Sequence, residues 1–181
     1  MKIQETGLPG VRLITPQEWR DERGSFSESW QRRRFEEAGL PAEWVQDNVS
    51  RSTAGVLRGL HFQQPGGQSK LVRVMQGAIF DVVVDVRYDS PSFGRAASFV
   101  LTDEGGIQLF VPAGYAHGFL VTSPEAVVHY KCTEYYQPQH ERTLLWNDPA
   151  IGIVWPAAAP VVSAKDAVGR PLAAFSTHEL P

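Results

Sequence analysis

The stretch KLVRVMQGAIFDVVVDVRY (residues 70–88) decides the fold of this chain. Two runs rich in β-branched residues flank the pair Gln76–Gly77, which is typical of a tight turn, so the stretch predicts two adjacent strands. Similar short runs occur at VLRGLHFQ (56–63), IQLFVP (107–112), AGYAHGFLV (113–121) and AVVHYKCTEYY (126–136). Strands that recur about every 8–12 residues between turn signals are typical of an antiparallel sandwich or barrel. We therefore predict an all-β fold.

One helix is expected outside this β-rich region, near Trp30–Ala38. Ser29 can cap its start, Gly39 can adopt the left-handed conformation that ends a helix, and Pro41 prevents continuation. The tail after Trp146 is rich in proline and alanine, so we expect mostly irregular packing over the barrel. No linker, repeat or low-complexity segment divides the chain, and residues 1–181 are expected to form a single domain.

The composition excludes several kinds of partner. Seventeen Lys and Arg against 20 Asp and Glu leave a net charge of −3, so no overall positive field attracts nucleic acid or an acidic membrane. The longest apolar stretches, near 79–86 and 108–121, are interrupted well short of the ~18 residues that span a bilayer. Cys132 is alone, and the start MKIQETGLPG lacks the apolar core of a signal peptide. We expect a soluble, cytoplasmic protein without nucleic-acid or membrane partners.

Alternation within the strands groups the side chains but leaves two questions open. Asp81 and Asp85 share one face of their strand with Ile79 and Val83. Either that face is solvated, or Asp81 lies inside a polar barrel lumen that binds a ligand. In VLRGLHFQ, Arg58 and His61 fall on opposite faces unless the glycine between them, Gly59, marks a β-bulge.

The motifs favour acid–base chemistry over other kinds of site. No metal is expected, because the five histidines form no HxH or HExxH pair and GLHFQ offers one histidine where metal-binding barrels commonly use two. Cys132 lies in the middle of a predicted strand, and GxSxG, GxGxxG and GxxxxGK[ST] are all absent. A histidine near its ordinary pKa and the tyrosines of YKCTEYY can exchange protons, although each type is more often structural. His117 follows a Pro–Gly turn and is expected just inside a strand at the barrel mouth.

Nine motifs, in this order, resemble the dTDP-4-dehydrorhamnose 3,5-epimerase family: DERGSFSES, VQDNVSRS, VLRGLHFQ, KLVRVMQGAIFDVVVDVR, SPSFG, VPAGYAHGF, YKCTEYY, LLWNDPAIGIVWP and SAKD. The resemblance runs from about Asp21 to Asp166. It implies a cupin-type jelly-roll barrel with one or a few short helices, a homodimer, and no metal or cofactor. The implied reaction inverts C3 and C5 of dTDP-4-keto-6-deoxy-D-glucose to give dTDP-4-keto-L-rhamnose, an isomerase step of rhamnose biosynthesis. Two alternatives stay open: a C3-only epimerase of an antibiotic-sugar pathway, and a sugar-nucleotide-binding cupin without turnover.

The resemblance also implies roles for individual residues. His61 of LRGLHF is the general base, Asp166 of SAKD its partner, and Tyr130 the acid on the opposite face. Lys70 lies beside the C4 oxygen, where negative charge develops in the enolate. The substrate-binding residues implied are Arg23, Glu28, Gln46, Asn48, Arg58, His117, Tyr136, Glu141 and Lys165. Since Tyr130 and Tyr136 are six residues apart, ~20 Å in an extended strand, we do not expect both at one reacting carbon.

Overall fold

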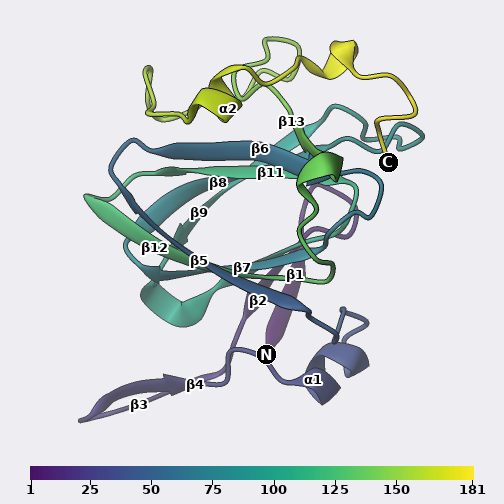
Figure 1. Ribbon diagram of the computed structural model, residues 1–181. Coiled ribbons are helices and arrows are strands. Elements are labelled where there is room, and N and C mark those ends of the chain that lie inside the picture. Colours follow the sequence, from purple (N-terminus) through teal and green to yellow (C-terminus); the bar gives the residue numbers. More distant parts are fainter.

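Two antiparallel sheets form the walls of a barrel in the computed structural model, which describes residues 1–181 (Figure 1). The six-stranded sheet has the order β1 (Lys2–Glu5), β2 (Arg12–Thr15), β10 (Gln108–Val111), β7 (Lys70–Gln76), β12 (Glu125–Cys132) and β5 (Gln46–Thr53). The five-stranded sheet has the order β13 (Glu141–Thr143), β6 (Leu57–Gln63), β11 (Tyr115–Val121), β8 (Ala78–Asp85) and β9 (Ala96–Thr102). The predicted all-β jelly-roll class is confirmed.

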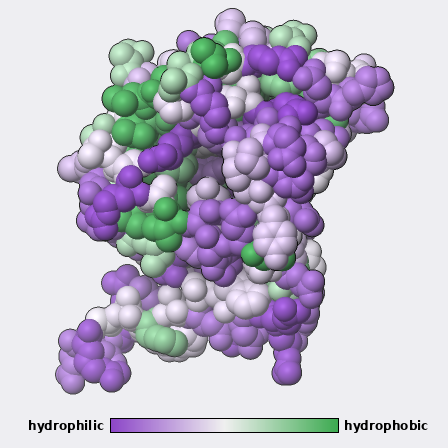
Figure 2. Space-filling view, in the orientation of Figure 1, coloured by the Kyte–Doolittle hydropathy of each residue, from purple (hydrophilic) through white to green (hydrophobic).

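The remaining elements are short. A separate hairpin of β3 (Glu18–Asp21) and β4 (Gly24–Ser27) projects from the body, and its polar tip stands apart in Figure 2. The α-helices are α1 (Arg32–Glu37) and α2 (Ala164–Ala167), and the 3₁₀ turns are η1 (Glu104–Gly106), η2 (Pro138–His140) and η3 (Leu172–Ala174). No helix reaches the length and apolarity that a membrane crossing requires.

The helix near Trp30–Ala38 is present, but its cap differs from the prediction. Gln31, and not Ser29, is the N-cap, because its side chain accepts a hydrogen bond from the Arg34 amide at 3.0 Å. Gly39 adopts the expected left-handed conformation, with φ of 64°. A six-residue helix is unstable alone, so the burial of Phe35 against the six-stranded sheet holds it in place.

Both faces of the five-stranded sheet are buried, which explains the nearly continuous apolar run of β8. Ile79 and Val83 point into the barrel core, whereas Val82 and Val84 point outward. The tail after Trp146 covers that outer face with Leu172, Phe175 and Leu180, as predicted (Figure 1). A solvated face for the two aspartates of β8 is therefore wrong: Asp81 and Asp85 are fully buried.

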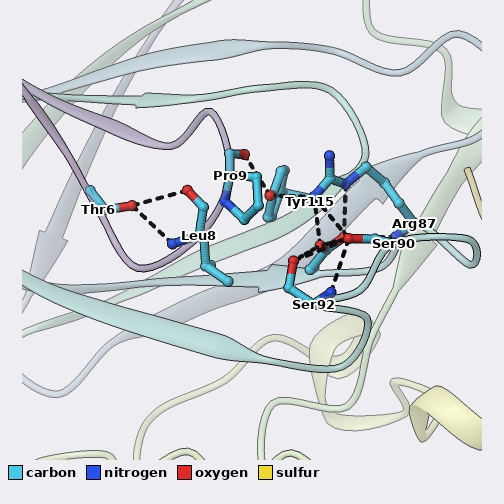
Figure 3. Close-up of polar contacts among 8 residues, drawn as sticks. Thr6, Leu8, Pro9, Arg87, Ser90, Ser92 and Tyr115 are labelled. Carbon is cyan, nitrogen blue, oxygen red and sulfur yellow. Dashed lines mark hydrogen bonds and ion pairs between the residues drawn. The ribbon is translucent and has the colours of Figure 1, made fainter.

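A polar network that includes Arg87, Ser90, Ser92 and Tyr115 surrounds the buried carboxylate of Asp85, and Figure 3 shows these four residues. The Asp85 carboxylate accepts hydrogen bonds from Arg87 Nε at 2.9 Å and from Ser90 Oγ and Ser92 Oγ at 2.6 Å each. Burial alone raises the pKa of this carboxyl, but those donors outweigh burial and lower the pKa to about 2. The network therefore stabilises the charged form of Asp85.

The same network fastens the N-terminal turn to the barrel. Arg87 Nη2 donates to Tyr115 Oη at 2.6 Å, and Tyr115 Oη donates to the Pro9 carbonyl at 2.7 Å. Pro9 belongs to the turn that precedes β2, in which Thr6 Oγ1 donates to the Val11 carbonyl at 2.8 Å. Segments distant in sequence are thus joined through buried hydrogen bonds.

We expect Asp85→Asn to lower the free energy of unfolding by about 2–4 kcal/mol at neutral pH, because it removes a buried charge with several donors. A lowered folded-state pKa stabilises the protein above the ordinary value of 3.8. That stabilisation is lost as the pH falls toward about 2, so the difference between wild type and variant narrows in acid. Urea denaturation at several pH values measures this difference in the free energy of unfolding. Asp89→Asn, at an exposed position nearby, is the control. Equal unfolding curves for wild type and Asp85→Asn at neutral pH would contradict this account.

Candidate active site

A cavity of about 640 Å³ lies within the barrel and contains most of the predicted site residues. Its lining includes eleven of the thirteen: Gln46, Asn48, Arg58, His61, Lys70, His117, Tyr130, Tyr136, Glu141, Lys165 and Asp166. They come from both sheets, from the loop after β12 and from α2. Asp81 itself does not line this cavity, but its partner His117 does, so neither alternative for Asp81 describes its position fully.

His61 and Asp166 form a close pair at the wall made by the five-stranded sheet. His61 Nε2 lies 2.6 Å from Asp166 Oδ1, and Asp166 Oδ2 accepts from the Gly59 amide at 3.3 Å. Burial tends to raise the pKa of Asp166, but the hydrogen bond from His61 leads the interactions that lower it below its ordinary value. The charged carboxylate accepts the Nε2 proton, so the lone pair of His61 lies on Nδ1.

A β-bulge brings Arg58 to the same cavity as His61. His117 of β11 lies opposite His61, and Phe119 lies opposite Arg58, so one residue of β11 faces two of β6. Gly59 has φ of 123°, and a Cβ there would lie 2.6 Å from the Gly118 Cα. The bulge that the glycine predicted is present, and it reverses the side of the strand on which Arg58 falls.

Lys70 occupies the opposite wall, on β7 of the six-stranded sheet. Burial lowers the pKa of its ammonium group, whereas the nearby Cys132, Asp81 and Glu141 act to raise it. Asp81 is fully buried, and its two oxygens lie 2.9 and 3.0 Å from His117 Nε2. Burial outweighs those charges and lowers the pKa of Lys70 overall, so its charged form gains most when an anion develops in the cavity beside it.

Tyr130 lies on the same wall as Lys70, because β12 and β7 are neighbours. Burial raises the pKa of its hydroxyl, and the fields of Cys132 and Glu141 raise it further against the opposing field of Arg58. Tyr130 is thus protonated at neutral pH and able to donate a proton. The base and the acid come from opposite walls, as removal and return of a proton on two faces of one carbon require.

The extended strand assumed between Tyr130 and Tyr136 is not present, and that the two tyrosines do not serve one reacting carbon stays a prediction. Strand β12 ends at Cys132, and the chain then turns, so the distance between the tyrosines is not that of an extended strand. Tyr136 lines the same cavity and donates from its hydroxyl to Glu141 Oε2 at 2.7 Å. This hydrogen bond leads the interactions that raise the pKa of Tyr136 to about 12.

Polar residues of β5 and its neighbours complete one end of the cavity. Gln46 Nε2 donates to Asn48 Oδ1 at 3.0 Å, and Gln46 Oε1 accepts from the Tyr136 amide at 2.9 Å. Arg58 Nε donates to Ser52 Oγ at 3.0 Å. These bonds hold the amide and guanidinium groups at the cavity wall, where they can contact a polar ligand.

Arg23 and Glu28 do not reach this cavity, in contrast to the prediction. Arg23 lies between β3 and β4, has 86% of its side chain exposed and pairs with Asp21. Glu28 pairs with Arg34 at 3.1 Å. The physical reason is the direction of the β3–β4 hairpin, which leads away from the barrel of its own chain (Figures 1 and 2).

Among the cavity residues that the sequence reasoning missed are two serines. Ser50 lines the cavity, and its buried Oγ has no hydrogen-bond partner. Alternation along β5 was the available signal, since Ser50 shares a face with Asn48. Ser163 caps α2 by accepting from the Asp166 amide at 3.1 Å, and the spacing Ser-x-x-Asp was its signal.

Fold and site together define a class: a jelly-roll barrel whose cavity holds an aspartate-paired histidine on one wall and a tyrosine on the opposite wall. The family model described as dTDP-4-dehydrorhamnose 3,5-epimerase matches residues 5–174, and the chain belongs to this family of isomerases. The resemblance noted from the nine motifs is thereby confirmed.

Three relatives place the chain within this family. A dTDP-4-dehydrorhamnose 3,5-epimerase of Neisseria gonorrhoeae is 49% identical over 171 residues, which cover 94% of this chain but about half (52%) of that protein. The structure of a Legionella pneumophila 3,5-epimerase with dTDP-4-keto-L-rhamnose is 43% identical, with a TM-score of 0.96 and coverage of 99% and 97% of the two chains. A 3'-monoepimerase of Streptomyces bikiniensis with dTDP-quinovose is 34% identical, with a TM-score of 0.88 and coverage of 93% and 86%.

Proposed function

We propose that this chain inverts C3 and C5 of dTDP-4-keto-6-deoxy-D-glucose and releases dTDP-4-keto-L-rhamnose. One observation supports the chemistry above all: the His61–Asp166 pair on one wall faces a cavity whose opposite wall holds Tyr130 and Lys70. The Legionella relative, with dTDP-4-keto-L-rhamnose bound, supports the choice of substrate. The reaction is a rhamnose-pathway isomerisation that needs no group beyond the chain's own side chains.

The proposed mechanism uses the C4 ketone that C3 and C5 both flank. His61 Nδ1 removes the proton from C3 or C5, and the electron pair of that C–H bond enters an enolate whose oxygen lies beside Lys70. Tyr130 then donates its proton to the other face of the same carbon. Asp166 holds the imidazole ring and stabilises the imidazolium that forms. The carbon emerges inverted, and the atoms of the sugar are otherwise unchanged.

We assign the nucleotide end of the ligand to the cations and amides of the cavity. Arg58 and Lys165 are suited to the diphosphate because guanidinium and ammonium groups donate charge-assisted hydrogen bonds to phosphate oxygens. Gln46, Asn48 and His117 supply further polar contacts along the cavity wall. Glu141 and Tyr136 border the sugar from the side of β13.

Incubation with dTDP-4-keto-6-deoxy-D-glucose in D₂O, followed by NMR, tests the reaction. We expect deuterium at both C3 and C5, and a product that a 4-keto-reductase converts to dTDP-L-rhamnose. Label confined to C3 after long incubation would replace the proposal with a C3-only epimerase, an alternative that the 34% identical monoepimerase keeps open. No exchange at either carbon would indicate a sugar-nucleotide-binding cupin.

We further propose that residues 1–181 act as one domain of a homodimer in which Arg23 and Glu28 serve the site of the second copy. The β3–β4 hairpin supports this, because Trp19 and Phe26 are 50% and 70% exposed on it. A two-stranded hairpin is marginally stable alone in water, so a neighbouring surface has to cover these rings. The cytoplasmic location stays a prediction of the sequence.

Arg23→Ala is expected to raise KM about 10- to 100-fold, the loss of one charged hydrogen bond to the ligand, with a smaller effect on kcat. Co-expression of Arg23→Ala with His61→Ala tests directly whether Arg23 of one copy serves the site of the other copy. A mixed dimer then holds one site with both residues intact, and activity at low substrate exceeds that of either variant alone. Arg33→Ala on exposed α1 is the control. Absence of complementation would place Arg23 outside the partner's site.

A further inference from the structure

Glu141 connects the base to the surface of the protein. Its Oε1 lies 3.8 Å from His61 Nδ1, and its Oε2 accepts the Tyr136 hydroxyl at 2.7 Å. Lys165 Nζ bridges both oxygens at 2.9 and 2.8 Å. The Glu141 side chain is 14% exposed, whereas that of Lys165 is 52% exposed. The Glu141 carboxylate thus lies near His61 on one side and contacts the more exposed side chains of Tyr136 and Lys165 on the other.

The other nitrogen of His61 has no comparable route to solvent. Nε2 faces Asp166, whose side chain is 4% exposed. The Gly59 amide donates to Asp166 Oδ2, and the backbone amide of Asp166 donates to Ser163 Oγ. A proton on Nε2 is therefore held in place, and the proton that His61 gains from the sugar lies on Nδ1, toward Glu141.

Two inversions in sequence require the base to be reset between them. This step rests on the proposed function. After the first inversion His61 is an imidazolium and Tyr130 a phenolate, with no net change of charge. The second inversion needs a neutral imidazole and a protonated phenol again, so one proton has to leave Nδ1 and one has to reach Tyr130. The His61 side chain is 24% exposed, so in the proposed complex the sugar has to lie between the imidazole and bulk water for a separate outlet to be needed.

We propose that Glu141 is the proton outlet of His61, which resets the base between the two inversions. The N–H bond at Nδ1 breaks, its electron pair stays on the imidazole, and an O–H bond forms at Glu141 Oε1. The carboxylic acid then releases the proton to water beside Lys165 and Tyr136, while the phenolate of Tyr130 takes one proton from water. One proton leaves and one enters, so charge and atoms balance.

The surroundings of Glu141 suit a group that accepts a proton briefly. Burial raises its pKa, but the hydrogen bonds from Lys165 and Tyr136 outweigh burial and hold the pKa below its ordinary value. The carboxyl therefore returns its proton to water readily. A separation of 3.8 Å exceeds hydrogen-bond length by about 1 Å, which a small rotation of either side chain closes.

Glu141→Gln tests the outlet, because glutamine keeps the shape of the side chain and one accepting oxygen for Tyr136 and Lys165, but cannot take up the proton. In D₂O we expect the second inversion to slow about 10²-fold relative to the first, so that singly inverted, singly labelled sugar accumulates. This product ratio does not depend on how tightly the starting substrate binds. Added imidazole buffer is expected to restore the second inversion, and Glu141→Asp to show a smaller defect.

A control variant and the wild-type reaction distinguish a failure of the outlet proposal from a failure of the proposed function. Glu134→Gln, an exposed glutamate of the loop after β12, is expected to give the wild-type product ratio. Double inversion by Glu141→Gln at the wild-type ratio would overturn the outlet, as would an equal slowing of both inversions that imidazole does not relieve. Wild-type protein that exchanges neither carbon would contradict the proposed function itself, and not the outlet.

Discussion

His61→Ala is expected to lower kcat by about 10²- to 10⁴-fold, while KM changes much less. The reason is that Nδ1 supplies the lone pair that removes the sugar proton, whereas binding of the nucleotide rests on other residues. Steady-state kinetics measures the change in KM, and the rate of deuterium exchange at C3 measures the loss of proton removal. Asp166→Asn is expected to lower kcat less than His61→Ala does. The amide of asparagine no longer fixes the Nε2 proton, so the imidazole loses its tautomer and orientation.

A histidine outside the cavity provides the control for this loss. His178 is exposed near the C-terminus, and His178→Ala is expected to leave turnover unchanged. Nearly full activity of His61→Ala would remove this residue from the mechanism. Equal loss in His61→Ala and His178→Ala would indicate damage to the fold, which circular dichroism and a thermal melt detect.

Tyr130→Phe is expected to lower the rate of inversion by about 10²- to 10⁴-fold while exchange of the C3 proton persists. Phenylalanine keeps the ring in its half-buried position on β12 but cannot donate a proton to the face opposite His61. The base can still remove and return a proton on its own face, so deuterium enters with retention of configuration. NMR of the recovered substrate distinguishes retention from inversion.

The neighbouring tyrosine offers a matched control for this substitution. Tyr135 is 65% exposed and does not line the cavity, so Tyr135→Phe is expected to invert both carbons as the wild type does. Inversion by Tyr130→Phe at the wild-type rate would exclude Tyr130 as the acid. Loss of exchange together with inversion would show that the hydroxyl also supports removal of the proton.

Local pattern accounts for the elements that could be predicted. The β-branched runs between turn residues mark β6, β7, β8, β11 and β12, and alternation correctly separates the two faces of β8. Gly59 signals its bulge because a side chain there would collide with β11. Each of these features depends on residues close together in sequence, whose backbone geometry repeats every two positions along a strand.

The pairing of His61 with Asp166 could not be derived in this way. The two residues are 105 positions apart, and only the resemblance to a known family joined them before the structure. Glu141 was expected to contact substrate, but its place between the base, Tyr136 and Lys165 follows from the pairing of β13 with β6. Neither contact leaves a periodic signal in the sequence.

The sequence by itself determined strands β6, β7, β8, β10, β11 and β12, their alternation, the short helix and the motifs of the family. The tertiary structure alone decided that Asp81 is buried beside His117, that Tyr130 and Tyr136 share a cavity, and that Arg23 leaves its own barrel. The physical reason is one of range. Periodicity is fixed by neighbouring peptide units, whereas strand order, register and the direction of a hairpin depend on which distant surfaces can be buried together.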